Sequence, residues 1–334
     1  MTKAQKVKRT VFLAVLLVLL VGTALSGCGG TKKESLTPAA STQIGSEWQQ
    51  RAPLPSARSE VAAVALEGKV YVIGGLTANA EITKLVEAYD PASNTWEQKA
   101  ELPVALHHTS AVAADGKIYV IGGLIAGFAP VNSVFEYEPE ADVWSIRASM
   151  PTARGGLATA VVNGKIYAIG GVTGFGGSNI ATLEVYDPLS NTWETLSPMT
   201  WGRDHLAVGV VDGKIYAIGG RLELNFGSNL SVNEEYDPQT DTWSMKAPLP
   251  TARSGIAAGV LDNKIYVFGG EDPSGTFDEN EAYDPASDSW KQFSPMPTPR
   301  HGLGAAVIGD TIYVVGGGTS PGSTDSNANE AFQP

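Results

Sequence analysis

Short apolar runs alternate with polar turns along this chain, and their order repeats. A small, apolar segment such as 254–261 precedes a polar turn, and an apolar run rich in β-branched and aromatic residues follows, as at 70–73, which a pair of glycines ends. After a variable loop comes a run that ends in Tyr-Asp-Pro or Tyr-Glu-Pro, where the proline cannot donate to a ladder and closes a third strand. A fourth run opens on a tryptophan. Each unit therefore predicts four antiparallel strands in a meander.

The glycine pair and the tryptophan share one period. The pair occurs at Gly74-Gly75, Gly122-Gly123, Gly170-Gly171, Gly219-Gly220, Gly269-Gly270 and Gly316-Gly317. The intervals between pairs are 48, 48, 49, 50 and 47 residues. The periodic tryptophans are Trp48, Trp96, Trp144, Trp193, Trp243 and Trp290. A fixed period of this size indicates a propeller or a solenoid.

These repeated residues resemble the kelch family, which combines a glycine pair, Tyr-Asp-Pro and a tryptophan at this spacing. The resemblance covers about 48–334 and implies a β-propeller, and six glycine pairs imply six four-stranded blades. The expected fold is thus an all-β, six-bladed β-propeller over residues 47–334. The last repeat departs from the pattern because no tryptophan follows Gly316-Gly317, whereas Trp48 has no strands before it. We expect the N-terminal segment 47–51 to supply the outer strand of the last blade and close the ring.

The first 28 residues have the features of an export signal. A charged start at 3–9 is followed by an apolar stretch, 11–21, that is short for a membrane span, and then by Leu25-Ser26-Gly27-Cys28. This ending resembles the lipobox of bacterial lipoproteins, which implies removal of a signal peptide, 1–27, and lipidation of Cys28. A simple N-terminal membrane anchor without lipidation is the alternative. Residues 28–46 are rich in Gly, Ser, Thr, Lys and Pro and are expected to form a flexible tether, so that the propeller is extracytoplasmic and lipid-anchored to the cell membrane or outer membrane.

Charge and cysteine content narrow the function classes. The chain carries 23 basic and 35 acidic residues, and four of the basic ones, Lys3, Lys6, Lys8 and Arg9, belong to the signal. The remaining balance of 19 against 35 gives −16 and disfavours nucleic-acid binding. Cys28 is the single cysteine, so no internal disulfide forms, and its place outside the propeller disfavours the cysteine–tyrosine cross-link that kelch-type copper oxidases need. We expect a monomeric propeller without a cofactor.

An arginine also recurs, sixteen residues before the first glycine of a pair. The positions are Arg58, Arg154, Arg203, Arg253 and Arg300, and Leu106 takes that place in the second repeat. A ring of arginines could form an anion site. A residue fixed in nearly every repeat is more typical of a structural bridge to a backbone carbonyl or a neighbouring carboxylate, and this is the prediction we adopt.

Residues that fail to repeat cluster on one face of the predicted disc. Strands alternate in direction within a blade, so the loop entering the innermost strand and the loop after the glycine pair share a face. All four histidines lie in the first kind of loop, at His107, His108, His205 and His301, together with Trp201. The loops after the glycine pairs contribute Phe128, Phe175, Phe226 and Phe277, and also Arg221 and Glu271. We expect an aromatic rim around a channel mouth lined by imidazole and charge.

The residue two positions after the arginine differs between repeats. The residues at this position are Glu60, His108, Gly156, His205, Gly255 and Gly302. In animal kelch domains that capture acidic peptides this position can be an arginine pointing into the central pocket, so the departure here disfavours acidic-peptide capture. His108 and His205 could be metal ligands, but they belong to different repeats, and no nearby cysteine or paired carboxylate motif completes a set, so no metal is expected.

Two function classes remain open. The loops between each glycine pair and the following Tyr or Phe span only 13 to 16 residues, which favours a binding surface for an envelope protein or a glycan over a lidded active site. The ligand-binding candidates are Glu60, His108, His205, Trp201, Arg221, Glu271, Phe128, Phe175, Phe226 and Phe277. The alternative is a small-sugar epimerase or mutarotase, since the chain resembles the kelch-type sialic acid mutarotases in architecture and secretion. There Glu60, His108, His205 or Arg221 would transfer protons.

Overall fold

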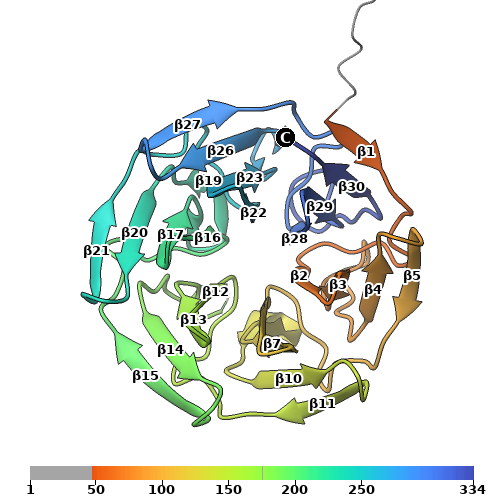
Figure 1. The fold of residues 1–334 in the computed structure, drawn as a ribbon, viewed down its shortest axis with the longest axis horizontal. Coiled ribbons are helices and arrows are strands. Elements are labelled where there is room, and N and C mark those ends of the chain that lie inside the picture. Colours follow the sequence, from red (N-terminus) through yellow and green to blue (C-terminus); the bar gives the residue numbers. More distant parts are fainter. Residues whose placement is uncertain (1–46, 175) are drawn as a thin grey trace, which may run out of the picture. The chain divides into compact units, whose positions relative to one another are not determined.

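Six four-stranded antiparallel sheets stand around a central axis in the computed structural model, which describes residues 47–174 and 176–334 (Figure 1). The first three blades consist of β2 (Ala62–Leu66), β3 (Lys69–Ile73), β4 (Val86–Asp90) and β5 (Thr95–Gln98); β6 (Ser110–Ala114), β7 (Lys117–Ile121), β10 (Val134–Glu138) and β11 (Val143–Ile146); and β12 (Ala158–Val162), β13 (Lys165–Ile169), β14 (Leu183–Asp187) and β15 (Thr192–Leu196). The prediction of an all-β, six-bladed propeller with four strands in each blade is confirmed.

The last three blades have the same order from the axis outward. They consist of β16 (Ala207–Val211), β17 (Lys214–Ile218), β20 (Asn233–Asp237) and β21 (Thr242–Met245); β22 (Ala257–Leu261), β23 (Lys264–Phe268), β26 (Asn280–Asp284) and β27 (Ser289–Gln292); and β28 (Gly304–Ile308), β29 (Thr311–Val315), β30 (Asn329–Phe332) and β1 (Trp48–Gln50). The sixth blade thus combines both ends of the described chain. β1 pairs antiparallel with β30, with Trp48 opposite Phe332, and the Gln333 amide donates to the Glu47 carbonyl at 2.9 Å (Figure 1).

Each periodic tryptophan ties its outer strand to the segment that leaves the preceding blade. Trp96 Nε1 donates to the Ala52 carbonyl at 2.8 Å, and the other five indoles make the equivalent bond. The turn before the tryptophan adds a second link. Asn94 Oδ1 accepts from the Tyr89 hydroxyl at 2.6 Å and from the Ala52 amide at 2.9 Å. The repeated Tyr and Trp therefore hold neighbouring blades together.

The repeated arginines are structural, as predicted. In the third blade Arg154 Nη1 donates to Glu184 Oε2 at 2.6 Å, and Nη2 donates to the Ala168 carbonyl at 3.0 Å. The same ion pair joins Arg58 to Glu87, Arg203 to Glu234, Arg253 to Glu281 and Arg300 to Glu330. In the second blade both charges are absent, and Leu106 and Phe135 lie buried in one apolar cluster instead.

The glycine pairs lie where neighbouring backbone leaves no room for a side chain. At Gly170, with φ +63°, a Cβ would lie 2.7 Å from the Arg203 carbonyl oxygen, and at Gly171, with φ +104°, it would lie 2.8 Å from that of Gly155. Only glycine combines a positive φ with such close approach. The pair thus lets the end of a second strand pack against the loops that enter the innermost strands.

Short two-stranded ribbons lie in the loops after three of the glycine pairs. They are β8 (Leu124–Ile125) with β9 (Ala129–Pro130), β18 (Arg221–Leu222) with β19 (Asn225–Asn229), and β24 (Glu271–Asp272) with β25 (Gly275–Thr276). A 3₁₀ turn, η1 (Ala126–Phe128), joins the first two strands. Over residues 47–174 and 176–334 no helix has the length and apolar character needed to cross a membrane. These ribbons carry Arg221, Glu271 and Phe128 to the face that holds the candidate site.

Candidate functional site

One residue from each blade forms a ring around the axis, at the position two after the repeated arginine. The six are Glu60, His108, Gly156, His205, Gly255 and Gly302, and each has φ between 52° and 66°. Their backbones are joined in sequence: the His108 amide donates to the Glu60 carbonyl at 3.2 Å, and the Gly156 amide donates to the His108 carbonyl at 2.8 Å. The chain of bonds continues to Gly302, whose carbonyl accepts from the Val61 amide at 3.4 Å.

Three members of this ring carry side chains although their backbone favours glycine. A residue with a Cβ in the left-handed region costs about 1–2 kcal/mol, and glycine occupies the same place in the other three blades. The fold therefore does not require side chains at Glu60, His108 and His205. Strain that is retained in this way is typical of functional sites.

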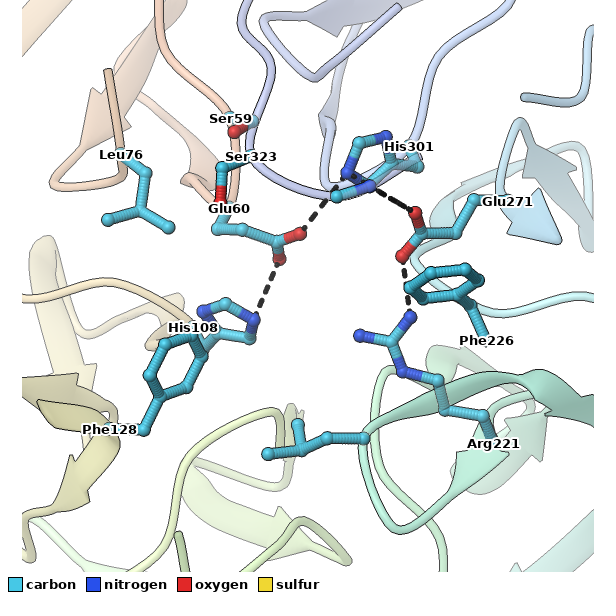
Figure 2. A pocket seen from close by; sticks show the side chains of 12 residues that line it. Ser59, Glu60, Leu76, His108, Phe128, Arg221, Phe226, Glu271, His301 and Ser323 are labelled. Atoms are coloured by element: carbon cyan, nitrogen blue, oxygen red, sulfur yellow. Dashed lines mark hydrogen bonds and ion pairs between the residues drawn. The ribbon is translucent and has the colours of Figure 1, made fainter. Parts of the chain in front are cut away.

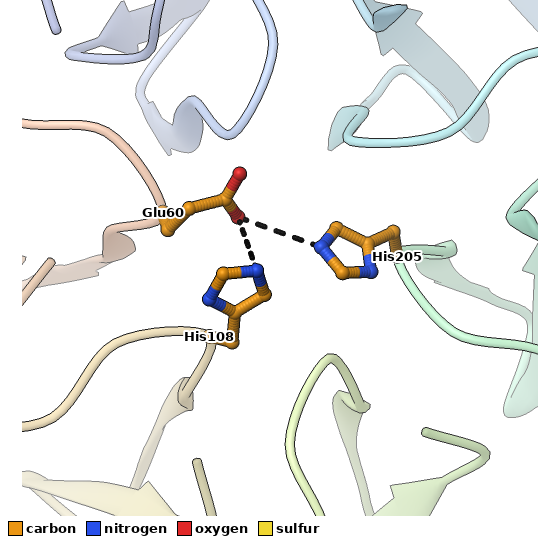
Figure 3. A group of neighbouring side chains, drawn as sticks. All are labelled: Glu60, His108 and His205. Carbon is orange, nitrogen blue, oxygen red and sulfur yellow. Dashed lines mark ion pairs between the residues drawn. The ribbon is translucent and has the colours of Figure 1, made fainter. Parts of the chain in front are cut away.

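The three side chains meet at the axis (Figure 3). Glu60 Oε2 lies 3.4 Å from His108 Nε2 and 3.7 Å from His205 Nε2, and Glu60 Oε1 lies 3.7 Å from His301 Nε2. The Glu60 side chain is 11% exposed, and the three imidazoles are more deeply buried. Blades far apart in the sequence thus place one carboxylate among three imidazoles.

Outer partners fix the orientation of two of these imidazoles. His205 Nδ1 bonds Asp204 Oδ1, a carboxylate that can only accept, so Nδ1 carries the proton. Arg221 Nη2, which can only donate, lies 2.8 Å from His205 Nε2, so Nε2 presents a lone pair. His301 Nδ1 donates to the Gly318 carbonyl at 3.2 Å, which in the neutral ring leaves the lone pair on Nε2.

His108 is oriented by its neighbour in the chain. Burial lowers the pKa of His107. Its Nδ1 atom lies 2.6 Å from His108 Nδ1, so one ring donates to the other. This bond orients His108 with Nε2 toward Glu60.

Arg221, from β18, links the ring to Glu271, from β24. Its Nη1 donates to Glu271 Oε1 at 2.5 Å, and its Nε donates to Asp204 Oδ1 at 3.3 Å. Glu271 Oε2 lies 3.6 Å from His301 Nε2. Figure 2 shows the resulting chain of contacts from Arg221 through Glu271 and His301 to the ring. Every guanidinium nitrogen of Arg221 is thereby held by a group of the site.

Burial and charge set the protonation of these groups. Burial acts to raise the pKa of Glu60, but the positive charge of the surrounding imidazoles in their protonated forms, and of Arg221, outweighs it and holds that pKa well below its usual range. Burial lowers the pKa of His108 well below 6.5, although Glu60 opposes this, so the imidazole is neutral at neutral pH. Burial also acts to raise the pKa of Asp204, and its partners His205 and Arg221 lower it overall. Glu60 and Asp204 therefore stay ionised, and His108 takes up a proton less readily than a free imidazole.

A pocket of about 140 Å³ opens above the ring (Figure 2). Polar groups of Glu60, His108, Arg221, Glu271 and His301 converge on it. Its remaining wall is formed by Ser59, Leu76, Phe128, Leu224, Phe226, Gly322 and Ser323. The pocket thus combines buried acid–base groups with two aromatic rings at its edge.

An apolar groove of about 670 Å³ adjoins this pocket and shares part of its wall. Leu76, Phe128 and Ser323 line both spaces, and Ile82 and Val104 lie farther out in the groove. The Phe128 ring lies edge-on to that of His107, with 5.0 Å between their centroids. Phe128 therefore separates the polar centre from the apolar surface.

Most of the residues predicted from the sequence come together here. Those that line the pocket or the ring are Glu60, His108, His205, Arg221, Glu271, Phe128 and Phe226. Trp201 is 52% exposed and lines neither, and Phe277 is half-buried outside both. Phe175 and Cys28 lie outside the described residues. The expected aromatic rim is thus reduced to Phe128 and Phe226 among the residues that the structure describes.

Two ionisable groups of the site were not among the predicted ligand-binding residues. Asp204 directly follows a repeated arginine, and His301 holds the same place in the sixth blade. The residues at that place in the other blades are Ser59, His107, Gly155 and Ser254. A departure from the repeat marks this position too, so the rule that found Glu60 could have found Asp204. His108 and His205 belong to different repeats, and the structure nevertheless places Glu60 beside both.

Comparison with known proteins agrees with this architecture. The family model of the KLHDC2/KLHL20/DRC7 Kelch-repeats domain matches residues 17–220 and 204–332. The chain belongs to the kelch-repeat family. The solved structure of YjhT has the same fold as this kelch propeller, with a TM-score of 0.73 at 18% identity over 83% of this chain and 95% of YjhT. No curated protein matches the sequence.

Proposed function

We propose that this kelch propeller binds a small, neutral carbohydrate at the mouth of its axis. The observation that carries the proposal is the pocket of about 140 Å³ in which buried hydrogen-bonding groups converge beside Phe128 and Phe226. A pocket below about 300 Å³ suits a ligand of about one sugar ring better than a segment of a protein. Carboxylates and imidazoles bond hydroxyl groups, and aromatic rings stack on sugar faces.

The charge balance supports a neutral ligand. Glu60, Asp204 and Glu271 supply three carboxylates, whereas Arg221 is the one guanidinium that contacts them at the pocket among the described residues. Arg221 is already paired with two of these carboxylates. An acidic sugar or an acidic peptide would meet an excess of negative charge without a free cation to bind it.

Titration of the full-length chain with neutral monosaccharides and their methyl glycosides tests the proposal. Phe226→Ala should weaken binding about tenfold, which is about 1.4 kcal/mol. Trp201→Ala is the matched control, because Trp201 is exposed and lines no part of the pocket, and it should leave affinity unchanged. Retention of one envelope protein from an extract, together with silence on every neutral sugar, would refute carbohydrate binding in favour of protein binding.

Interconversion of sugar anomers is a second candidate function. The specific observation is the Asp204–His205 pair beside Glu60, which is the arrangement of an oriented base next to a carboxylate. Proton transfer at the ring oxygen and the anomeric hydroxyl would open and close the sugar ring. Anomer exchange measured by NMR should exceed that in buffer and be lost in His205→Ala, and equal rates for the two proteins would exclude it.

A lipid anchor at Cys28 is the proposed means of attachment to the cell envelope. Support comes from the charged start, the short apolar stretch and the Leu25-Ser26-Gly27-Cys28 ending. Residues 28–46, which lie outside the described part of the chain, would then join this anchor to the propeller. On this proposal the pocket meets ligands outside the cytoplasm.

A further inference from the structure

The contact between Glu60 and its imidazoles is unusual in its chemistry. The Nε2 atom of His205 presents a lone pair, as Asp204 and Arg221 fix, and the Glu60 carboxylate beside it also only accepts. The separations of 3.4 Å and 3.7 Å exceed those of a good hydrogen bond. Acceptors that converge in a buried place are stabilised by a cation among them.

The spacing of these atoms is that of ligands around a small metal ion. Zinc holds nitrogen and oxygen at about 2.0–2.2 Å, which places neighbouring corners of a tetrahedron about 3.3–3.5 Å apart. Glu60 Oε2 lies 3.4 Å from His108 Nε2 and 3.7 Å from His205 Nε2, and the ligand atoms of all three residues lie within 4.8 Å of one another. Two sides of this triangle already match that spacing to within about 0.4 Å, and the third, between the two imidazoles, is at most 4.8 Å and must shorten when an ion binds.

The outer partners also match those of metal-bound histidines. Such residues donate the second ring nitrogen to a carboxylate or another acceptor, which fixes the tautomer and raises ligand basicity. His205 Nδ1 donates to Asp204 in this way, and His108 Nδ1 is hydrogen-bonded to His107 Nδ1. Two imidazoles and one carboxylate are ligands for zinc and similar divalent ions, whereas Ca²⁺ and Mg²⁺ prefer sites made of oxygen.

We propose that Glu60, His108 and His205 form a binding site for a divalent transition-metal ion of the zinc class. Three protein ligands leave a fourth position, which faces the pocket because Glu60 and His108 line it. Arg221 is the cation that competes with the metal ion, because its Nη2 donates to His205 Nε2 at 2.8 Å. Metal binding therefore requires the Arg221 side chain to rotate so that Nη2 leaves His205, while Nη1 keeps its bond to Glu271. The ion binds whether or not the pocket accepts a carbohydrate.

Titration of the chelator-treated, full-length chain with Zn²⁺ tests the site, with Co²⁺ as a spectroscopic probe. One equivalent should bind, and Co²⁺ should give the intensified visible absorption of a tetrahedral nitrogen–oxygen site. Glu60→Gln and His205→Ala should each weaken Zn²⁺ binding at least 100-fold, and Asp204→Asn about 10–100-fold. Arg221→Met should strengthen it, because the competing cation is removed.

Trp201→Ala is the control, since Trp201 is 52% exposed and lines neither the pocket nor the ring, and it should retain wild-type Zn²⁺ affinity. Glu60→Gly covers the case in which Glu60→Gln fails to fold, because glycine occupies the same backbone position in three blades. Failure of the wild-type chain to bind Zn²⁺ overturns the proposal. So does unchanged affinity in folded Glu60→Gly or His205→Ala, or loss of affinity in Trp201→Ala with none in His205→Ala.

Discussion

The buried Arg154–Glu184 pair of the third blade offers a test of what the repeated ion pairs do for stability. The second blade has Leu106 and Phe135 in the same two places, and both are buried. Three variants follow from this comparison: Arg154→Leu, Glu184→Phe and the double variant that copies the second blade. The chain thus supplies its own apolar replacement for a buried ion pair.

The single changes should be far more damaging than the double change. Arg154→Leu leaves the Glu184 carboxylate, whose side chain is 1% exposed, without its guanidinium, and removing one partner of such a pair costs about 3–5 kcal/mol. In the double variant both charges leave. The double variant still loses the hydrogen bond from Arg154 to the Ala168 carbonyl, at 3.0 Å, and the bond from the Thr152 hydroxyl to Glu184, at 2.7 Å. Together these cost about 1–3 kcal/mol, which burial of the new apolar side chains partly offsets. The coupling between the two changes should therefore be at least about 3 kcal/mol.

Urea unfolding of the full-length chain, followed by tryptophan fluorescence, measures the free energy of unfolding for each variant. Glu194→Gln is the charge control, because Glu194 is exposed on β15, and it should change stability by less than about 0.5 kcal/mol. The reasoning is refuted if the double variant loses the sum of the two single losses. That result would mean that the charges act separately and that the second blade is stabilised in some other way.

Three further changes have defined outcomes. In the wild type, unfolded His108 binds a proton below pH 6.5, whereas the buried His108 of the folded protein stays neutral until a lower pH, so the free energy of unfolding falls with pH. His108→Gln should make this fall less steep, as measured by urea midpoints between about pH 5 and 7.5. Trp243→Phe should cost about 1 kcal/mol through loss of the bond to the Ser197 carbonyl, with a lower urea midpoint and unchanged m-value. Cys28→Ser should move the protein from the membrane fraction to the soluble fraction, and continued attachment would indicate an anchor without lipidation.

The fold follows from the sequence because each signal recurs in several blades. The glycine pair leaves room for a neighbouring carbonyl, such as that of Arg203, and the tryptophan donates to a carbonyl of the preceding blade, such as that of Ala52. Both contacts recur around the ring. Repetition therefore separates structural residues from the rest. The recurrence of the arginines predicts a structural role, and the buried ion pair between Arg154 and Glu184 is an example of that role.

The site follows only in part, because it depends on directions that the repeat does not encode. Glu60, His108 and His205 stand out as departures from glycine, but only the ring geometry brings blades one, two and four to one point. Trp201 and Phe277 belong to loops of the predicted face, yet neither lines the pocket. Side-chain orientation in loops depends on backbone angles that a single sequence does not specify.

The pairing of β1 with β30 means that the circle of blades has no natural first member. Gln333 bonds Glu47, so the two ends of the described propeller lie side by side in antiparallel strands of one sheet. A short linker between these ends, with new termini in any exposed outer turn, would give a circular permutant with the same ring of blades. Because the pocket lies at the axis, such a permutant should keep it unchanged, and only the blade that carries the two termini would differ.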